Sequence, residues 1–316
     1  MKEKIRGLHH VTAIATDPQR NLDFYVGLLG LRFVKRTVNF DDPGSYHFYF
    51  GDNRGTPGTI LTFFPWPEAR RGSRGTGQIE ATAFAILPSS MGYWRDRLKQ
   101  HHVMAERISR FATEGVRFTD PDGLLLELIG EVSLPPIEPW PGSSIPIEHA
   151  LHGFHSVSAA VEGYERTARL LTDTFGFRLS ENSENRFRFV SADDAAPGRI
   201  VDLLCLPDTS MGHVAAGSVH HIAFRAKDNA EQLEWRARLV DLGYDVTPVV
   251  DRTYFNSIYF REPGRILFEI ATEPPGFTLD EKLEELGTHL RLPSWYQSSR
   301  SDIERALPPI QPPAQS

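Results

Sequence analysis

The sequence has almost no cysteine, no long apolar run and no concentrated block of positive charge. Cys205 is its single cysteine, which excludes internal disulfides and zinc clusters built from thiolates. No stretch of about eighteen apolar residues occurs, and no apolar segment follows the charged residues 1–6, so we expect neither a membrane span nor a secretory leader. A formal net charge of -7 without a lysine and arginine cluster argues against nucleic acid and anionic membranes as partners. We therefore expect a soluble, cytoplasmic protein.

One short phrase with adjacent histidines occurs twice, far apart in the chain. It covers residues 7–13 (GLHHVTA) and residues 218–224 (SVHHIAF), and both copies have the apolar character of strands. Alternation of side chains along a strand places His10 and His221 on the more open faces, and His9 and His220 on the opposite ones. The face of His220 is apolar and is expected to pack on a helix. We therefore predict His10 and His221 as metal ligands.

A third ligand is predicted from the apolar run ILFEI, which contains Glu269. Burying a lone carboxylate among apolar neighbours is costly, so Glu269 needs a charged partner. A divalent metal is the simplest partner, and an ion pair with Arg265 or Arg225 is the structural alternative. Two histidines and one glutamate on strands thus predict a metal site.

Internal repeats divide the sequence into four units of one kind. Counterparts of the histidine phrase occur at residues 79–85 and 153–159, and a proline followed six residues later by a site on an apolar strand occurs four times. Each unit has the pattern of a strand, a helix and then several strands, βαβββ. The first phrase aligns His10, Glu80, Ser156 and His221, and the second aligns Phe63, Glu127, Leu203 and Glu269.

A proline-rich segment separates the four units into two pairs. With 316 residues and 40% hydrophobic content, the chain is long enough for about two domains. We predict an N-terminal domain at 1–133 (modules at about 7–66 and 77–131), a linker at 134–149, and a C-terminal domain at 150–275 (modules at about 151–206 and 217–273). A tail follows at 276–316, with an amphipathic helix from Leu279 to Leu290, a short helix around Ile303 and a mobile proline-rich end.

Taken together, these phrases resemble the vicinal oxygen chelate superfamily and, more narrowly, its ring-cleaving dioxygenases of the hydroquinone 1,2-dioxygenase type. The resemblance extends over nearly the whole chain and rests on residues 7–12, 41–47, 57–66, 219–223, 252–261 and 267–270. It implies an α+β fold in which four βαβββ modules form two pseudo-symmetric, cupped, mixed sheets with helices outside. It also implies that modules one and four share a metal bound by His10, His221 and Glu269. Substrate or supporting roles are implied for His9, Thr12, His220, Arg252 and Tyr259.

The ligand set has chemical content of its own. Two histidines and one carboxylate leave about three coordination positions open, as in non-haem Fe(II) oxygenases that bind substrate and O₂ together. Mn(II) accepts the same ligands. The fourth equivalent position, Phe63, cannot coordinate, and the equivalent positions of the other two modules (Glu80, Ser156, Glu127 and Leu203) include no histidine, so we expect one metal per chain. For an aromatic diol substrate, Arg252 is expected to stabilise anionic oxygen, Tyr259 to donate a hydrogen bond, and His220 or His9 to move a proton.

Several alternatives stay open at this point. Arg252 as a surface charge and Tyr259 as a packed aromatic are the structural alternatives to their roles in the site. The scaffold also suits an O₂-independent lyase, isomerase or thiol transferase, and a non-catalytic protein that sequesters an aromatic drug or quinone. The residues themselves permit a hydroquinone or a catechol, and the resemblance favours the hydroquinone. The apolar faces of such sheets make a homodimer or higher homo-oligomer plausible.

Overall fold

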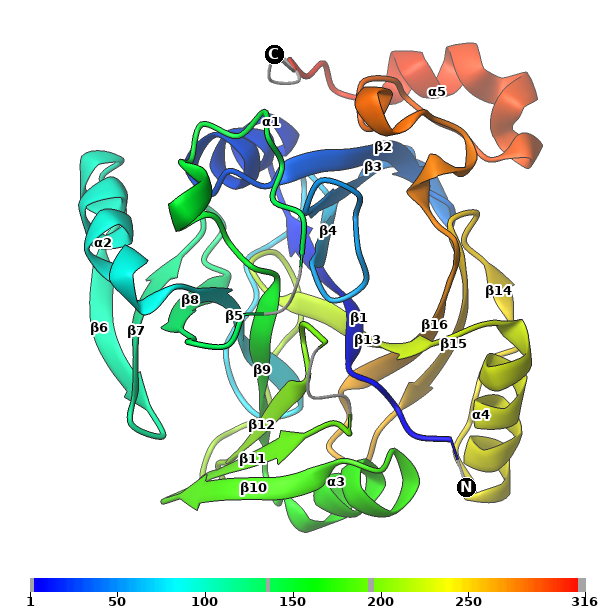
Figure 1. The fold of residues 1–316 in the computed structure, drawn as a ribbon. Coiled ribbons are helices and arrows are strands. Elements are labelled where there is room, and N and C mark those ends of the chain that lie inside the picture. The colour runs from blue at the N-terminus through cyan, green and yellow to red at the C-terminus, as the bar shows by residue number, and fades with distance from the viewer. Residues whose placement is uncertain (1–2, 135–136, 193–195, 312–316) are drawn as a thin grey trace.

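The computed structural model describes residues 3–134, 137–192 and 196–311, which form two curved eight-stranded sheets (Figure 1). The first sheet has the order β14 (Val250–Asp251), β15 (Phe255–Arg261), β16 (Leu267–Pro275), β13 (Val219–Ala226), β1 (Leu8–Ala15), β4 (Ile60–Pro65), β3 (Asp42–Gly51) and β2 (Arg32–Asn39). The second has the order β10 (Arg178–Ser183), β11 (Arg186–Val190), β12 (Ile200–Cys205), β9 (Phe154–Val161), β5 (Gln78–Ile86), β8 (Leu125–Gly130), β7 (Thr113–Thr119) and β6 (Ala105–Arg110).

Each sheet joins two βαβββ modules at its centre. In the first, β1 of module one pairs antiparallel with β13 of module four, and each of these strands pairs in parallel with the last strand of its own module. In the second, β5 of module two and β9 of module three meet in the same way. The predicted α+β fold of two cupped mixed sheets is thus confirmed. Each sheet contains strands from both sides of the predicted linker. The domain boundaries themselves stay a prediction.

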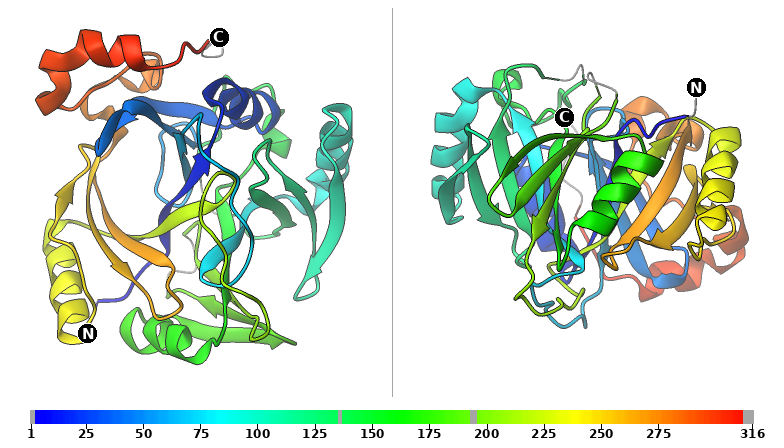
Figure 2. Two further views of the ribbon diagram at one scale, coloured as in Figure 1. Left: turned by 180° about the vertical axis from the view of Figure 1, so that it is seen from behind. Right: turned by 90° about the horizontal axis from the view of Figure 1, so that it is seen from below.

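The helices lie outside the sheets (Figure 2). They are α1 (Pro18–Leu22) continued by a π-helical turn (Asp23–Leu28), α2 (Met91–Gln100), α3 (Glu165–Arg169) continued by a π-helical turn (Leu170–Thr174), α4 (Asn229–Asp241) and α5 (Arg300–Ala306). Asp228 begins α4 because its side chain accepts a hydrogen bond from the Glu231 amide, as an N-cap does. The buried side chains of α4 include Trp235 and Leu239, which belong to a hydrophobic core that extends through both sheets.

The tail departs from the helix predicted between Leu279 and Leu290. That prediction is wrong, because the segment contains only short 3₁₀ turns at Phe277–Leu279 and Leu283–Glu285. Adjacent residues point about 100° apart on an α-helix, yet Asp280 and Glu281 both contact the ammonium of the buried Lys35. The short helix predicted around Ile303 is confirmed as α5. The proline-rich end was predicted to be mobile, and its last residues, 312–316, lie outside the described part of the chain.

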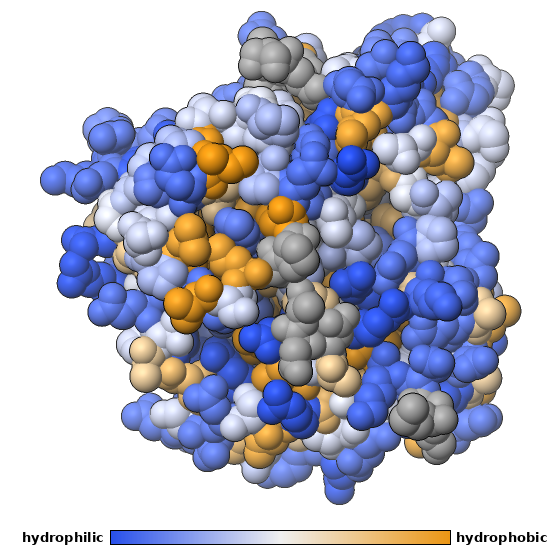
Figure 3. Space-filling view, in the orientation of Figure 1, coloured by the Kyte–Doolittle hydropathy of each residue, from blue (hydrophilic) through white to orange (hydrophobic). Residues whose placement is uncertain are grey.

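The tail covers the strands of module one, where it passes over β2 and β3 (Figure 1). Leu290 forms a bridge with Arg36 of β2, and the Tyr46 hydroxyl of β3 donates to the Pro308 carbonyl at 3.0 Å. Hydrophilic side chains predominate on the face shown in Figure 3, with smaller apolar groups between them. No helix among the described residues combines the length and the apolar character needed to cross a membrane.

A buried carboxyl gives the fold a testable pH dependence. Asp120 accepts hydrogen bonds from the Leu124 amide and the Tyr25 hydroxyl, and burial raises its pKa from 3.8 to about 6. Between these values the folded chain holds a proton that the unfolded chain has lost, so this group makes stability fall as pH rises. Relative to Asp120→Asn, the wild-type free energy of unfolding should increase by about 1.4 kcal/mol between pH 7.5 and pH 5. Urea unfolding at both pH values measures this difference. The same change in the free energy of unfolding with pH in the wild type and in Asp120→Asn would contradict it.

Candidate metal centre

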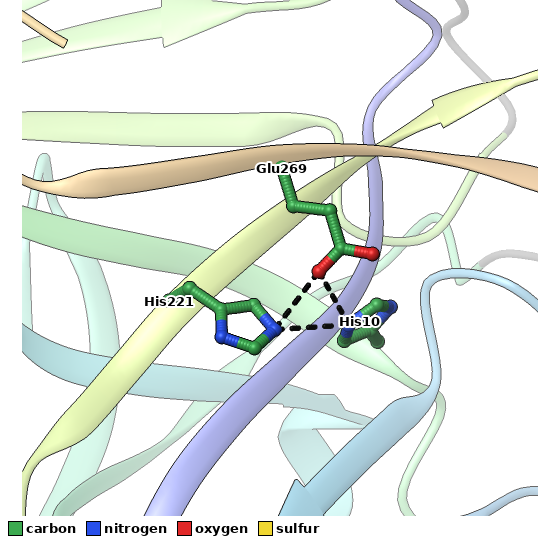
Figure 4. Close-up of side chains that lie close together, drawn as sticks. All are labelled: His10, His221 and Glu269. Atoms are coloured by element: carbon green, nitrogen blue, oxygen red, sulfur yellow. Dashed lines mark hydrogen bonds and ion pairs between the residues drawn. The ribbon is translucent and has the colours of Figure 1, made fainter. Parts of the chain in front are cut away.

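Three buried side chains from three neighbouring strands of the first sheet point at one another (Figure 4). His10 lies on β1, His221 on β13 and Glu269 on β16. Their ligand atoms form a small triangle. Glu269 Oε2 lies 2.9 Å from His221 Nε2 and 3.3 Å from His10 Nε2, and the two Nε2 atoms are 3.4 Å apart. Among the described residues this is the one cluster of three or more potential ligands with converging atoms.

A bulge in each histidine strand explains how both members of each pair come close to the site. The ladder between β1 and β13 skips His9 on one strand and His220 on the other. A bulge inserts one extra residue and re-aims its side chain, so strict alternation fails there. His220 consequently lines the cavity in front of the metal ligands. The expectation that it faces a helix is therefore wrong.

The non-ligand histidine of each pair, His9 or His220, orients the neighbouring ligand, His10 or His221. His10 Nδ1 lies 3.0 Å from His9 Nδ1, and His221 Nδ1 lies 2.7 Å from His220 Nδ1. Burial lowers the pKa of His9 well below its ordinary value and that of His220 to about 3, so both rings are neutral and can accept at Nδ1. If His10 and His221 donate from Nδ1–H, their Nε2 lone pairs are free for a metal.

Glu269 presents one oxygen to a partner and the other to the two histidines. Its Oε1 accepts a hydrogen bond of 2.5 Å from Ser257 Oγ, whereas Oε2 is buried and makes no hydrogen bond despite its short distances to His10 and His221. Burial alone would raise the pKa of Glu269, but the two histidines outweigh it and hold the pKa well below its ordinary value. The carboxylate is therefore ionised, and its free oxygen is oriented toward a shared point rather than toward either ring.

These donors fit a divalent metal ion. Ligands at right angles, each about 2.1 Å from a metal, are about 3 Å apart, close to the distances between the three atoms. Two neutral imidazoles and one carboxylate on one side of the ion are the facial set of non-haem Fe(II) oxygenases. The ion would also compensate the buried charge of Glu269.

The position equivalent to Glu269 in module one is Thr62 and not Phe63, as the sequence alignment had it. Glu269 pairs with Ala223, which lies two residues after the ligand His221. In module one the residue two after the ligand His10 is Thr12, and it pairs with Thr62. Phe63 lies in the core, with its ring centroid 4.6 Å from that of Tyr25. Either residue leaves the site without a fourth carboxylate or imidazole from this position.

In the second sheet the positions equivalent to the metal ligands hold no such set, and the glutamate among them forms ion pairs with arginines. The bulge in β5 falls at Glu80, so Ala81 and not Glu80 stands where His221 stands in the first sheet. Glu127, the counterpart of Glu269, accepts hydrogen bonds from Arg117 at 2.7 Å and Arg110 at 3.0 Å. These guanidinium groups supply the positive charge that a metal would supply in the first sheet.

A cavity of about 430 Å³ opens in front of the three ligands. Of the residues predicted around the metal, Arg252, Tyr259 and His220 line it. His9 lies behind His10, and Thr12 is fully buried with its hydroxyl 2.9 Å from that of Thr62. The structure thus brings three of the five predicted residues to the cavity and places two behind it.

Arg252 and Tyr259 form one polar unit in the wall of the cavity. Arg252 Nε donates to the Tyr259 hydroxyl at 3.1 Å, and its Nη1 donates to Asp41 at 3.1 Å. Although burial opposes it, the contacts with Tyr259 and Asp41 raise the pKa of Arg252 above its ordinary value. Burial raises the pKa of Tyr259, which is therefore a neutral phenol. The next residue, Thr253, has a φ of 67°, a strained conformation for a β-branched side chain.

Sequence reasoning missed several residues of this cavity. His47 and Tyr49 of β3 line it, with the Tyr49 hydroxyl 2.9 Å from His47 Nδ1, while His47 Nε2 lies 2.9 Å from Thr62. Both ring nitrogens of His47 thus have partners in the protein, and its ring serves as a wall. Phe255 packs against His10 with ring centroids 5.1 Å apart. The continuous aromatic run of residues 46–50 is the local feature of the sequence that points to this wall.

The fold and the site together define the class of protein. Paired βαβββ modules curl around the cluster of His10, His221 and Glu269, and the chain belongs to the Glyoxalase/Bleomycin resistance protein/Dioxygenase superfamily, whose family model matches residues 7–128 and 153–270. This family implies a metal, and the resemblance noted in the sequence is confirmed.

The similar proteins narrow the class further. The chain is 45% identical over 315 residues to MhqO of Bacillus subtilis, which carries the name of a ring-cleaving dioxygenase, with 98% of each chain covered. It is 32% identical to the chlorohydroquinone/hydroquinone 1,2-dioxygenase of Sphingobium indicum, with 97% of each chain covered. A crystal structure titled as a dioxygenase of Bacillus subtilis superposes with a TM-score of 0.94 at 45% identity, covering 98% of this chain and 99% of that one. Glyoxalase I from Zea mays, at 15% identity and a TM-score of 0.65 over 90% of this chain and 97% of that one, shares the fold.

Ser257 offers a test of the carboxylate orientation. It is fully buried, and its hydroxyl is the hydrogen-bond donor to Glu269 Oε1. Ser257→Ala should weaken metal affinity roughly tenfold to a hundredfold, the usual loss when a partner of a metal ligand is removed. Competition with a chelator measures it. Ser191→Ala is the control. It removes another buried hydroxyl, which donates to the Arg6 carbonyl and not to a metal ligand, and should leave the affinity unchanged.

Proposed function

We propose that this protein is a non-haem Fe(II)-dependent ring-cleaving dioxygenase that inserts O₂ into a hydroquinone or catechol. The observation that carries the proposal is the buried set of His10, His221 and Glu269 at the end of an aromatic cavity. The similarity of this chain to proteins named as ring-cleaving dioxygenases supports the same reaction class. Mn(II) is the alternative metal, because it accepts the same ligands.

His10, His221 and Glu269 would hold the ion, which when bound supplies open positions for a diol oxygen and O₂ and a path for electrons between them. The chain supplies the rest. Phe255 and the ring of His47 hold the arene between them, in a volume suited to a single-ring diol.

The polar residues of the cavity have distinct proposed roles. Arg252 is a fixed positive charge for anionic oxygen of the substrate. The neutral Tyr259 hydroxyl donates a hydrogen bond to substrate oxygen. His220, whose Nδ1 accepts a hydrogen bond from His221, carries its proton on Nε2 and can donate it there to substrate oxygen. His9 and Thr12 act from behind, His9 by orienting His10 and Thr12 through Thr62.

The preference for a hydroquinone rests on the Sphingobium indicum relative, which is named for chlorohydroquinone and hydroquinone. The absence of a fourth ligand at Thr62 disfavours the glyoxalase-like alternative, since such enzymes are expected to use one.

The test is O₂ consumption by protein reconstituted with Fe(II) without air and then given hydroquinone, methylhydroquinone, chlorohydroquinone or catechol. Stoichiometric O₂ uptake with a ring-opened product supports the proposal. Turnover without O₂ in the presence of Ni, Co, Zn or Mn would support a lyase, isomerase or thiol transferase instead. Saturable binding without any product would support a sequestering protein.

A further inference from the structure

The cavity has very little charge of its own apart from the metal ligands. Among its described lining residues, the charged side chains are Arg252, Asp41 and Asp42. Both ring nitrogens of His47 have partners in the protein, Tyr49 and Thr62, at 2.9 Å in each case. One cation and two carboxylates leave this part of the wall with a net negative charge.

The single cation is already engaged from two sides. Arg252 donates through Nε to Tyr259 and through Nη1 to Asp41, at 3.1 Å in each case. Asp41 belongs to the turn between β2 and β3 of module one, and Arg252 precedes β15 of module four. The ion pair thus links the two modules across the cavity wall. An anionic group that entered beside Arg252 would have to displace Asp41 or lie next to it.

The position of Asp41 is built into the fold, although its side chain is 75% exposed. The Asp41 amide donates to Asn39 Oδ1 at 3.0 Å. The preceding residue, Phe40, packs its ring edge-on against Trp295 of the tail, and its carbonyl accepts from the Tyr296 hydroxyl at 2.8 Å. The tail therefore supports the turn that carries Asp41.

From this arrangement we infer that Asp41 determines the charge selectivity of the substrate site. Because Asp41 already pairs with Arg252, a second anionic group beside the diol oxygen finds no free partner, so the cavity admits rings whose substituents are uncharged, such as alkyl groups or halogens, and rejects rings that bear a carboxylate. The inference rests on the proposed function, because it concerns substituents on the diol that the metal binds. Like charges that face each other in a partly desolvated site disfavour the wrong partner.

Methylhydroquinone and gentisate form a matched pair of probes, because a methyl group in the first is a carboxylate in the second. The wild-type protein should prefer methylhydroquinone, measured as the ratio of the two kcat/KM values. Asp41→Asn should lower this ratio about threefold to fivefold, the effect of removing one largely exposed negative charge and freeing one guanidinium donor. Asp41→Glu, which keeps the charge, should keep the ratio within about twofold. Chelation of the metal by gentisate cancels in these comparisons, since all three proteins share the ligands.

The same pair of probes separates failure of this inference from failure of the proposed function. If the wild-type protein turns over neither of these rings, nor hydroquinone, chlorohydroquinone or catechol, the proposed function fails. Asp41 is then still tested by the dissociation constants of both rings on the Fe(II)-loaded protein without O₂, whose ratio should change by the same factor of about three to five. If a ratio of rates or of constants is measurable and is equal in wild type and Asp41→Asn, the carboxylate has no part in selection. Loss of selectivity in Asp41→Glu as well as in Asp41→Asn would also overturn the inference. It would show that the shape of the side chain, and not its charge, determines which ring binds.

Discussion

Replacement of Glu269 by alanine is expected to abolish stoichiometric metal binding and, with it, ring cleavage. Glu269 is fully buried, and its Oε2 is the one anionic atom in the triangle with His10 and His221. Removing a ligand should cost more than the roughly hundredfold affinity loss caused by removing a ligand's partner. The measurement is metal content per chain after Fe(II) loading and dialysis, with circular dichroism to show that the fold persists.

Glu273→Ala is the matched control for this variant. Glu273 lies on the same strand, β16, but is partly exposed and pairs with Arg225 at 3.0 Å. It should retain one metal per chain. Stoichiometric iron in Glu269→Ala would refute the assignment of this ligand. His10→Ala and His221→Ala are expected to behave as Glu269→Ala does.

The largest expected effect on stability comes from Lys35→Met. Lys35 is fully buried on β2, and its Nζ lies 2.7 Å from Asp280 Oδ1, beside Glu281 and 4.8 Å from the centroid of the Tyr254 ring. Removing the ammonium leaves Glu281, which is itself buried, without its nearest positive charge. Breaking a buried ion pair from one side costs about 3 to 5 kcal/mol. The midpoint of thermal unfolding should fall by roughly 6 to 10 °C.

A second substitution identifies the cause of that loss. If the unpaired carboxylate is responsible, adding Glu281→Gln to Lys35→Met should recover part of the lost stability, because no buried charge is then left over. Limited proteolysis should cut residues 277–300 faster in Lys35→Met than in the double variant. An unfolding midpoint within about 2 °C of the wild type in Lys35→Met would show that this contact does not anchor the tail.

The metal ligands were predictable because their signals are local. Adjacent histidines recur at equivalent positions of two strands, and a carboxylate in an apolar strand requires compensation, whatever the details of the fold. The same reasoning failed one residue away. His220 and Glu80 were placed by strict alternation or spacing, but each lies at a bulge, in β13 and β5, that changes where its side chain points. Phe63 was placed by its spacing from Pro57, which is one residue off the register of β4 with β1. A bulge leaves little trace in a single sequence, because it depends on the partner strand.

Other residues of the site could not be predicted because their contacts join distant segments. Asp41 and Arg252 are 211 residues apart in the sequence and meet only through the pairing of modules one and four. Ser257 orients Glu269 from a neighbouring strand. In the tail, the apolar spacing suggested a helix, but the buried charge of Lys35 determines the local conformation. Tertiary contacts of this kind override local propensity.

The central claim, that O₂ is inserted into the ring of an aromatic diol, is tested most directly with isotopically labelled O₂. Fe(II)-loaded protein is given hydroquinone or methylhydroquinone under the labelled gas, and the product is analysed by mass spectrometry before its aldehyde oxygen exchanges with water. We expect a ring-opened product that has gained both labelled oxygen atoms. A product that forms in iron-containing protein without any label would contradict the dioxygenase assignment.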